Sequence, residues 1–193
     1  VLLPTRSRPK SFLKSIISLI DNADNFHNNV EILVAMDTDD FHKYTDVMNI
    51  LINDYNCKNI KLYVCERLGY RKLNIYINNL CKLATGDWLF LWNDDSYIVS
   101  KHWDTNILKH NDEFKIINPR CTNGDFGGMP FPIIPKTWFD TTGCFSKHFA
   151  CDTWIQRVGS CLGFAIYYTD IYKEYKKELN ICLKNQTSSK KIK

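Results

Sequence analysis

Short apolar runs alternate with amphipathic segments through the first 95 residues, and this alternation constrains the fold more than any other feature of the sequence. The runs cover residues 1–3, 30–36, 60–65 and 88–92. Apolar runs of this length are typical of strands buried on both faces. The segments between them carry apolar residues at helical spacing, as in Leu13, Ile16, Ile17 and Ile20. The resulting βαβαβαβ order predicts an α/β fold with an open, mostly parallel sheet between helices.

Several helix ends are predicted from residues with known end preferences. Ser11, two positions after Pro9, is a candidate N-cap for the first helix. Asp39 or Asp40 is expected to cap the second, which covers about residues 44–55. Gly86 is the expected C-terminal residue of the third helix, because glycine tolerates the left-handed conformation found there.

The alternation stops after residue 95. The pattern there predicts a short helix near 103–110, a strand over 114–118, loops and an irregular hairpin over 123–135, a helix over 152–158 and a strand over 164–168. A closing helix is marked by Ile171, Tyr175, Leu179 and Cys182. We therefore expect one domain over 1–185, divided into halves at 1–95 and 96–185, and a disordered tail over 186–193.

Composition excludes several classes of protein. The 193 residues are 45% hydrophobic, which is enough for a core, and 25 Lys+Arg against 21 Asp+Glu leave a net charge of +4. This charge is too small to predict a nucleic-acid partner. No apolar stretch reaches the roughly 20 residues of a membrane span. Eight cysteines include no Cys-x-x-Cys pair, so free thiols in a reducing compartment are favoured over zinc or disulfides, and we expect a cytoplasmic protein.

Polar residues follow the last of the apolar runs directly. Asn93, Asp94 and Asp95 come after residues 88–92, and the carboxyl ends of parallel strands form the edge where open α/β sheets bind ligands. Carboxylate pairs suit hard cations such as Mg²⁺ or Mn²⁺. The alternative is a solvated turn, which Asn and Asp also favour.

The loop after the first run contains no glycine. Residues 4–9 read Pro-Thr-Arg-Ser-Arg-Pro, so neither a P-loop nor a dinucleotide fingerprint is available to surround phosphate with backbone N–H groups. A metal on Asp94 and Asp95, assisted by Arg6 and Arg8, can supply the missing positive charge. The alternative is an exposed basic loop.

Five segments in order resemble the nucleotide-sugar glycosyltransferases of the GT-A fold, especially those of family 2. They are residues 4–9, 37–40, 69–74 and 84–95, and the acidic helix start at Asp152. The resemblance implies a Rossmann-like sheet, with the nucleoside diphosphate-sugar donor on the half 1–95. It also implies a small irregular acceptor region over 96–185, a hydroxyl-bearing acceptor such as a carbohydrate, and a divalent cation. The activity implied is glycosyl transfer of the hexosyltransferase type.

The same resemblance assigns roles to single residues. Thr5 and Arg6 are expected beside the base and ribose, Asp37 is expected to accept a hydrogen bond from one of them, and Arg71 and Lys72 are expected near the diphosphate.

Asn93, Asp94 and Asp95 correspond to the D-x-D motif. The resemblance places Asp94 toward the ribose or donor sugar and Asp95 on the metal. Asn93 replaces the first acid of the motif, and its amide adds no negative charge to the metal site.

Asp152 is the general base that the resemblance implies, for transfer with inversion. The alternative role for Asp152 is a first-turn acid that stabilises its helix. Four aromatic residues nearby either form an acceptor platform or pack a small subdomain: Trp138, Phe139, Phe145 and Trp154. Two other functions stay open, a nucleotidyltransferase that makes sugar nucleotides and a non-catalytic protein that binds carbohydrate or nucleotide.

Overall fold

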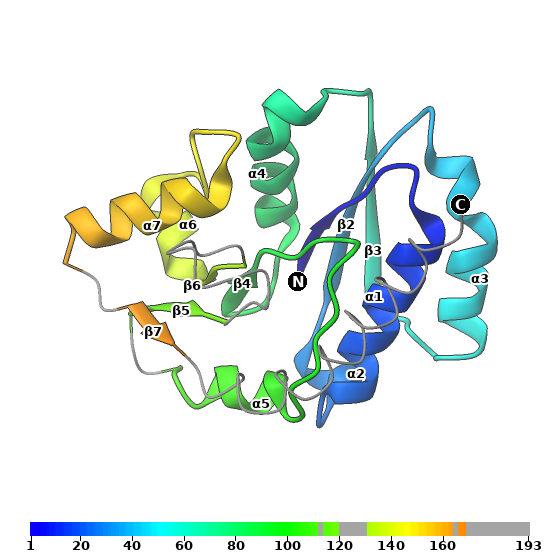
Figure 1. Cartoon of the computed structure of the whole chain (residues 1–193), viewed down its shortest axis with the longest axis horizontal. Coiled ribbons are helices and arrows are strands. Elements are labelled where there is room, and N and C mark those ends of the chain that lie inside the picture. Colours follow the sequence, from blue (N-terminus) through cyan, green and yellow to red (C-terminus); the bar gives the residue numbers. More distant parts are fainter. Residues whose placement is uncertain (112–113, 120–130, 164–165, 169–193) are drawn as a thin grey trace, which may run out of the picture.

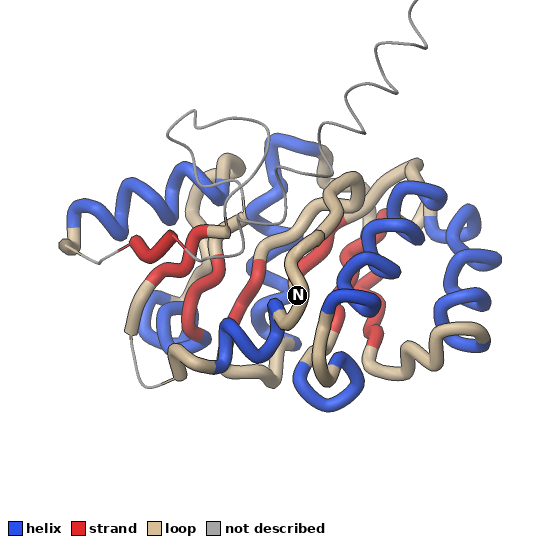
Figure 2. Tube along the Cα trace, turned by 60° about the horizontal axis from the view of Figure 1, so that its bottom comes forward, coloured by secondary structure: helices blue, strands red, loops and turns tan. Residues whose placement is uncertain are grey.

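The computed structural model describes residues 1–111, 114–119, 131–163 and 166–168. Its strands form one row, in the order β3-β2-β1-β4-β6-β5-β7, with helices on either side (Figures 1 and 2). The strands are β1 (Leu2–Pro4), β2 (Ile32–Asp37), β3 (Ile60–Cys65), β4 (Trp88–Phe90), β5 (Ile116–Asn118), β6 (Ile133–Pro135) and β7 (Ile166–Tyr168).

The row is mostly parallel. Strands β1, β2 and β3 pair in parallel, as do β5 and β7, whereas β6 runs antiparallel to both β4 and β5. A parallel bridge between Leu2 and Leu91, with the Trp92 N–H donating to the Leu2 carbonyl at 3.0 Å, joins β1 to the continuation of β4. The carboxyl ends of β1, β2 and β4 therefore lie at the same edge of the sheet.

Helices cover both faces of this sheet. One face packs against α1 (Pro9–Asn22), α2 (Phe26–Asn29), α3 (Thr45–Asn53) and α5 (Trp103–Leu108). The other packs against α4 (Leu73–Leu83), α6 (Lys136–Thr142) and α7 (Cys151–Cys161). Two short 3₁₀ helices, η1 (Phe41–Tyr44) and η2 (Tyr70–Lys72), precede α3 and α4. Among the described residues, no helix is long and apolar enough to cross a membrane.

The strand sequences specify these two layers through alternation. In β2, Val34 and Met36 face the α1 side while Leu33 and Ala35 face the α4 side, and all four are buried, as the twofold period of a strand requires. On α1, Phe12, Ile16 and Leu19 are fully buried at helical spacing. Burial of each such side chain contributes about 1.5–3 kcal/mol relative to exposure.

The predicted α/β fold is confirmed, but several local predictions were wrong. Ser11 does not cap α1, because the helix already begins at Pro9, whose fixed φ suits the first helical position. Gly86 does not end α4, because the helix already ends at Leu83 and Ala84 is extended. Residues 60–65 form β3 as predicted, whereas the strand predicted over 88–92 ends at Phe90 and continues only as the bridge at Leu91.

Part of the second half was missed. The sequence pattern did not reveal α6, although Pro135 before the helix and Gly143 after it, with φ 71°, are typical end signals. The predicted closing helix and the tail 186–193 lie outside the described residues, and so does most of the predicted hairpin over 123–135. The division into halves at residue 95 stays a prediction.

Candidate functional site

Polar residues from three strands meet at the carboxyl edge of the sheet. Thr5 follows β1, Asp37 ends β2, and Asp94 follows the continuation of β4. Thr5 Oγ1 donates to Asp94 Oδ2 at 2.6 Å, and Thr5 Oγ1 lies 2.8 Å from the hydroxyl of Tyr44. The three strand ends therefore bring together segments that are far apart in the sequence, as predicted.

Asp94 is buried, with 1% of its surface exposed. Burial raises the pKa of Asp94 above its ordinary value, although the Thr5 hydroxyl and the Arg8 guanidinium oppose this shift. A carboxylate in such surroundings favours a compensating positive charge nearby. Asp95 is half exposed, and the side chain of Asn93 is exposed while its backbone carbonyl accepts from Ser15 Oγ at 3.1 Å.

A single guanidinium bridges the two carboxylates. Arg8 Nη2 lies 2.9 Å from Asp94 Oδ1, and Arg8 Nη1 lies 2.5 Å from Asp95 Oδ2. One oxygen from each acid therefore faces the same cation. This donor set, two carboxylate oxygens that share a positive group, fits a hard divalent metal.

Within the described residues, no cluster of three or more His, Cys, Asp or Glu side chains could hold a metal. Additional metal ligands would have to come from water or from a diphosphate, as is common for Mg²⁺.

Arg6 forms a second ion-pair group at the same edge. Its Nη1 lies 2.5 Å from Asp37 Oδ2, and its two terminal nitrogens lie 2.6 and 2.8 Å from Asp39 oxygens. The hydrogen bonds from Arg6 lower the pKa of Asp39 to about 2. Asp37 is buried, and its Oδ1 accepts a hydrogen bond from the hydroxyl of Tyr76 on α4. Arg6 and Asp37 are thus adjacent, and their expected places beside the base and ribose stay a prediction.

Asp40 fixes the first loop instead of capping a helix. Its buried carboxylate accepts from the Ser7 N–H at 2.5 Å, from Ser7 Oγ at 2.9 Å and from Lys43 Nζ at 2.7 Å. Burial favours a higher pKa for Asp40, but the bonds from Lys43 and Ser7 outweigh it and lower this pKa. The predicted N-cap role for Asp39 or Asp40 was wrong, because no side-chain cap bond forms at the start of η1 or α3. Ser7 adopts φ 56°, which is uncommon for a non-glycine residue.

Arg71 and Lys72 lie in η2 and are exposed. The contacts of the described residues do not join them to the carboxylates. Their segment is nevertheless tied to the site, because the Tyr76 hydroxyl accepts from the Leu68 N–H at 2.7 Å while donating to Asp37.

Asp152 lies in the first turn of α7 and is half buried. Its Oδ1 accepts from the Thr153 N–H at 2.7 Å. Within the described part of the chain, no hydrogen bond or ion pair joins Asp152 to the carboxylates after β4. The segment before α7 is held by Asn78 on α4, which accepts from the N–H groups of Phe145 at 2.7 Å and Ser146 at 3.2 Å and donates to the Ser146 carbonyl at 2.9 Å. Helix α4 therefore contacts Asp37 through Tyr76 and the approach to α7 through Asn78.

The aromatic residues predicted as a platform or as packing belong to the core. Trp138 and Phe145 are buried, and the Trp138 ring packs edge-on against Trp154 with centroids 6.2 Å apart. Packing is thus confirmed for Trp138 and Phe145, whereas Phe139 and Trp154 pack against the core and stay partly exposed. A different aromatic pair is accessible, because Tyr70 is 73% exposed and contacts the ring of Phe149 at 5.8 Å.

The cysteines in the described part of the chain are free thiols, and they are buried except for the half-buried Cys65 and the exposed Cys161. Burial raises the pKa of Cys57 to about 11 and that of Cys151 to about 12. Cys121 and Cys182 lie outside the described residues. The six cysteines that the structure describes form no disulfide with one another.

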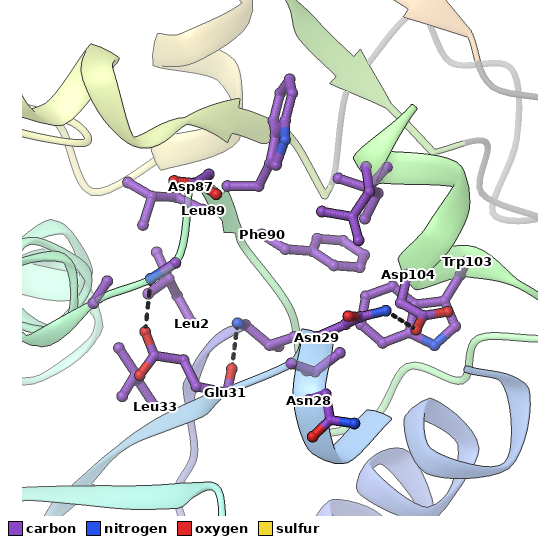
Figure 3. A pocket seen from close by; sticks show the side chains of 17 residues that line it. Leu2, Asn28, Asn29, Glu31, Leu33, Asp87, Leu89, Phe90, Trp103 and Asp104 are labelled. Carbon is purple, nitrogen blue, oxygen red and sulfur yellow. Dashed lines mark hydrogen bonds between the residues drawn. The ribbon is translucent and has the colours of Figure 1, made fainter. Parts of the chain in front are cut away.

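A cavity of about 300 Å³ lies at the opposite edge of the sheet, beside the amino ends of β1, β2 and β4 (Figure 3). Two of its three acids are engaged: Glu31 Oε1 accepts from the N–H groups of Thr85 and Gly86, and Asp104 accepts from the backbone of Asp24 and Asn25 and from Asn29. These bonds tie loops to the sheet, so Glu31 and Asp104 have a structural role, whereas the third acid, Asp87, is exposed.

Sequence reasoning missed Tyr44 and Tyr76. Both lie on apolar helix faces, where a tyrosine is indistinguishable from other packing residues by spacing alone. The available signal was chemical, since a buried tyrosine hydroxyl needs a hydrogen-bond partner.

The sequence matches no protein-family model and no curated protein sequence. Solved structures do match. The mannosyltransferase PcManGT from Pyrobaculum calidifontis, in complex with GDP-Man and Mn²⁺, superposes with a TM-score of 0.72 at 13% identity, over 88% of this chain and 54% of that one. The chain has the GT-A fold. TarS of S. aureus (residues 1–349) in complex with UDP matches with a TM-score of 0.59 at 15% identity, over 74% of this chain and 48% of that one. The chain thus spans about half the length of these two neighbours.

Proposed function

We propose that this GT-A domain transfers a sugar from a nucleoside diphosphate-sugar to a hydroxyl-bearing acceptor, with help from Mn²⁺ or Mg²⁺. The observation that carries the proposal is the pair Asp94 and Asp95, whose oxygens converge on one cation at the carboxyl edge of the sheet. This is the edge where α/β sheets bind nucleotides. The nucleotide ligands of the two structural neighbours, GDP-Man with Mn²⁺ and UDP, support the same class of donor.

Each residue at this edge would bind a different part of the donor. Asp37 would accept a hydrogen bond from the nucleobase or ribose, with Thr5 and Arg6 beside it. Asp95 would hold the metal together with one oxygen of Asp94, whose carboxylate would also face the ribose or donor sugar, and Asn93 would offer an amide to a hydroxyl. Arg71 and Lys72 are exposed, which leaves them able to reach diphosphate oxygens as charge-assisted donors. When bound, the metal would neutralise charge that develops on the diphosphate leaving group.

Asp152 would act as the general base. One of its oxygens is held by the Thr153 N–H, which leaves Oδ2 to take the proton of the acceptor hydroxyl. The deprotonated oxygen would then attack the anomeric carbon from the side opposite the diphosphate. The configuration at the anomeric carbon would therefore be inverted in the product. The hexosyl nature of the transferred group belongs to the same proposal.

A product assay tests the proposed reaction against the two alternatives. The protein is incubated with Mn²⁺ and a panel of UDP- and GDP-sugars, and the released products are separated by chromatography. A glycosyltransferase releases the nucleoside diphosphate, slowly to water or faster to a suitable acceptor. A nucleotidyltransferase, given a nucleoside triphosphate and a sugar phosphate, releases pyrophosphate instead. A protein that only binds releases neither, and that result would contradict the proposal.

A further inference from the structure

We propose that Arg8 is a built-in counter-ion of the metal site: it holds Asp94 and Asp95 in the free protein, a divalent metal displaces it, and its guanidinium then binds the diphosphate. The inference rests on the proposed function, because it assigns a control over metal binding to the same site. Arg8 would thereby couple the binding of the metal to the binding of the nucleotide.

The geometry makes Arg8 and a metal mutually exclusive at this position. The guanidinium contacts one oxygen of each acid, at 2.9 Å on Asp94 and 2.5 Å on Asp95. A Mg²⁺ ion held by the same two oxygens would lie about 2.0–2.1 Å from each. A cation so close would overlap the guanidinium and repel its charge, so the arginine side chain has to leave before the metal binds.

The site does not depend on Arg8 for its shape. Asp94 Oδ2 accepts from Thr5 Oγ1 at 2.6 Å, and the Thr5 side chain is within 2.8 Å of the buried Tyr44 hydroxyl. These contacts hold the Asp94 carboxylate from the side opposite its bond to Arg8. Removal of the guanidinium therefore leaves the acid in place and uncompensated, which increases its attraction for another cation.

The Arg8 side chain is free to move while its backbone is fixed. The Arg8 N–H donates to the Tyr44 hydroxyl at 3.2 Å, and its carbonyl accepts from the Phe12 N–H at 2.9 Å at the start of α1. The side chain itself is 52% exposed. A guanidinium in this position can rotate toward solvent or toward a phosphate without disturbing the helix.

This exchange predicts how the metal and the nucleotide bind. A metal that binds without nucleotide must break both ion pairs of Arg8, and the released guanidinium then has no new partner. When a diphosphate is also present, the released guanidinium finds phosphate oxygens, which it binds strongly and with two nitrogens. Metal and nucleotide therefore bind more tightly together than separately, and Arg8 accounts for part of that coupling.

The test measures Mn²⁺ binding without nucleotide, by the electron paramagnetic resonance signal of free Mn²⁺. Arg8→Met should bind Mn²⁺ more tightly than the wild type, by about 5-fold or more, the lower end of typical coupling between ligands. Arg8→Gln should behave in the same way and provides a second, polar replacement, and thermal melting checks that both variants are folded. In both variants, added UDP or GDP should tighten Mn²⁺ binding by a smaller factor than in the wild type.

Lys10→Met is the matched control. Lys10 is exposed and lies two residues after Arg8, so this variant removes the same net charge close to the site without removing the bridge. Its Mn²⁺ affinity should stay within about twofold of the wild type, because solvent and salt screen the charge of an exposed lysine. An equal gain in Lys10→Met and Arg8→Met would reduce the effect to net charge and overturn the proposal.

Two other outcomes would overturn the role of Arg8 in different ways. Unchanged or weaker Mn²⁺ binding in both Arg8 variants, with binding still lost on removal of Asp95, rejects the displacement and leaves the proposed function standing. Tight Mn²⁺ binding that persists in the double variant Arg8→Met/Asp95→Ala places the metal elsewhere, which removes this inference and the metal site of the proposed function together.

Discussion

At the scale of single residues, Asp94 combines a negative charge with nearly complete burial. Burial raises its pKa above the unfolded value of about 3.9. The folded protein therefore binds more protons than the unfolded chain between these two pKa values, and the free energy of unfolding falls as the pH rises through that window. Above the window, the ionised carboxylate lowers the stability of the metal-free protein.

Asp94→Asn should consequently raise the melting temperature of the metal-free protein at neutral pH, because the amide can still accept from Thr5 and carries no charge to bury. For a domain of this size, each 1 kcal/mol corresponds to about 2–4 °C. The gain should shrink as the pH is lowered toward the unfolded pKa, where the wild-type acid is also protonated. Melting curves recorded at a series of pH values from acidic to neutral measure this gain. A lower melting temperature at every pH would mean that the Thr5 and Arg8 bonds outweigh the cost of burial.

The prediction for the chemical step concerns Asp152, the proposed general base. Asp152→Asn should lower sugar transfer by about 100-fold or more, the usual scale for loss of a general base, while donor and metal affinities stay near wild type. The amide is isosteric and can still accept from the Thr153 N–H, so folding is preserved. Initial rates and calorimetric donor affinities separate these effects. Wild-type rates would assign the base elsewhere, with Asp140 the next candidate, and loss of donor binding would assign Asp152 to the donor site.

The candidate site was predictable from sequence where its residues follow strands. Asp94 and Asp37 come at strand ends, and parallel strands bring their carboxyl ends together. The partners of these acids were not predictable, because Tyr76 and Arg6 reach Asp37 across 39 and 31 residues. Such contacts depend on how helices pack on the sheet, which periodicity does not specify.

At the scale of elements, α4 connects the donor edge to the segment before α7. Tyr76 contacts Asp37 and the Leu68 backbone, and two residues later Asn78 makes three hydrogen bonds to the backbone of residues 145–146. Helix α4 therefore contributes to the position of Asp152 relative to the donor edge, together with the packing of α7 on α6 and the sheet.

Asn78→Ala should lower the free energy of unfolding by about 1–3 kcal/mol, because it leaves backbone groups of residues 145–146 without their partner. Hydrogen exchange should also accelerate at the amides of Phe145 and Ser146, which donate to this side chain. The control is Asn79→Ala, whose side chain contacts Tyr63 and Lys82 instead. Equal exchange rates at residues 145–146 in both variants would show that α4 does not hold this segment.

The accuracy of the element predictions followed the length and periodicity of each pattern. Strand β3 and helix α1 have long apolar patterns, and both were predicted. Helix α6 has seven residues, Lys136–Thr142, too few for a helical period to stand out from its aromatic surroundings. Strand β6 has three residues and gains its place from pairing with β4 and β5, which is a tertiary effect.

At the scale of the whole molecule, the site exists because two sheets join into one. The bond from Trp92 to Leu2 and the bridge at Leu91 place the carboxyl end of β4 beside that of β1. Asp94 thereby comes within reach of Thr5 and Arg8. Local sequence patterns could not predict the order of strands within this row, because many strand orders are compatible with the same alternation of strands and helices.

The central claim is that the carboxylates after β4 hold a metal together with a nucleoside diphosphate. Calorimetric titration of UDP or GDP with and without Mn²⁺ tests it, in the wild type, in Asp95→Ala and in Asp46→Ala, an exposed acid of α3 that serves as the control. We predict that Mn²⁺ tightens nucleotide binding in the wild type and in Asp46→Ala, by about 5- to 150-fold on the usual scale of such coupling, and that this gain disappears in Asp95→Ala. An undiminished Mn²⁺ effect in Asp95→Ala would contradict the account.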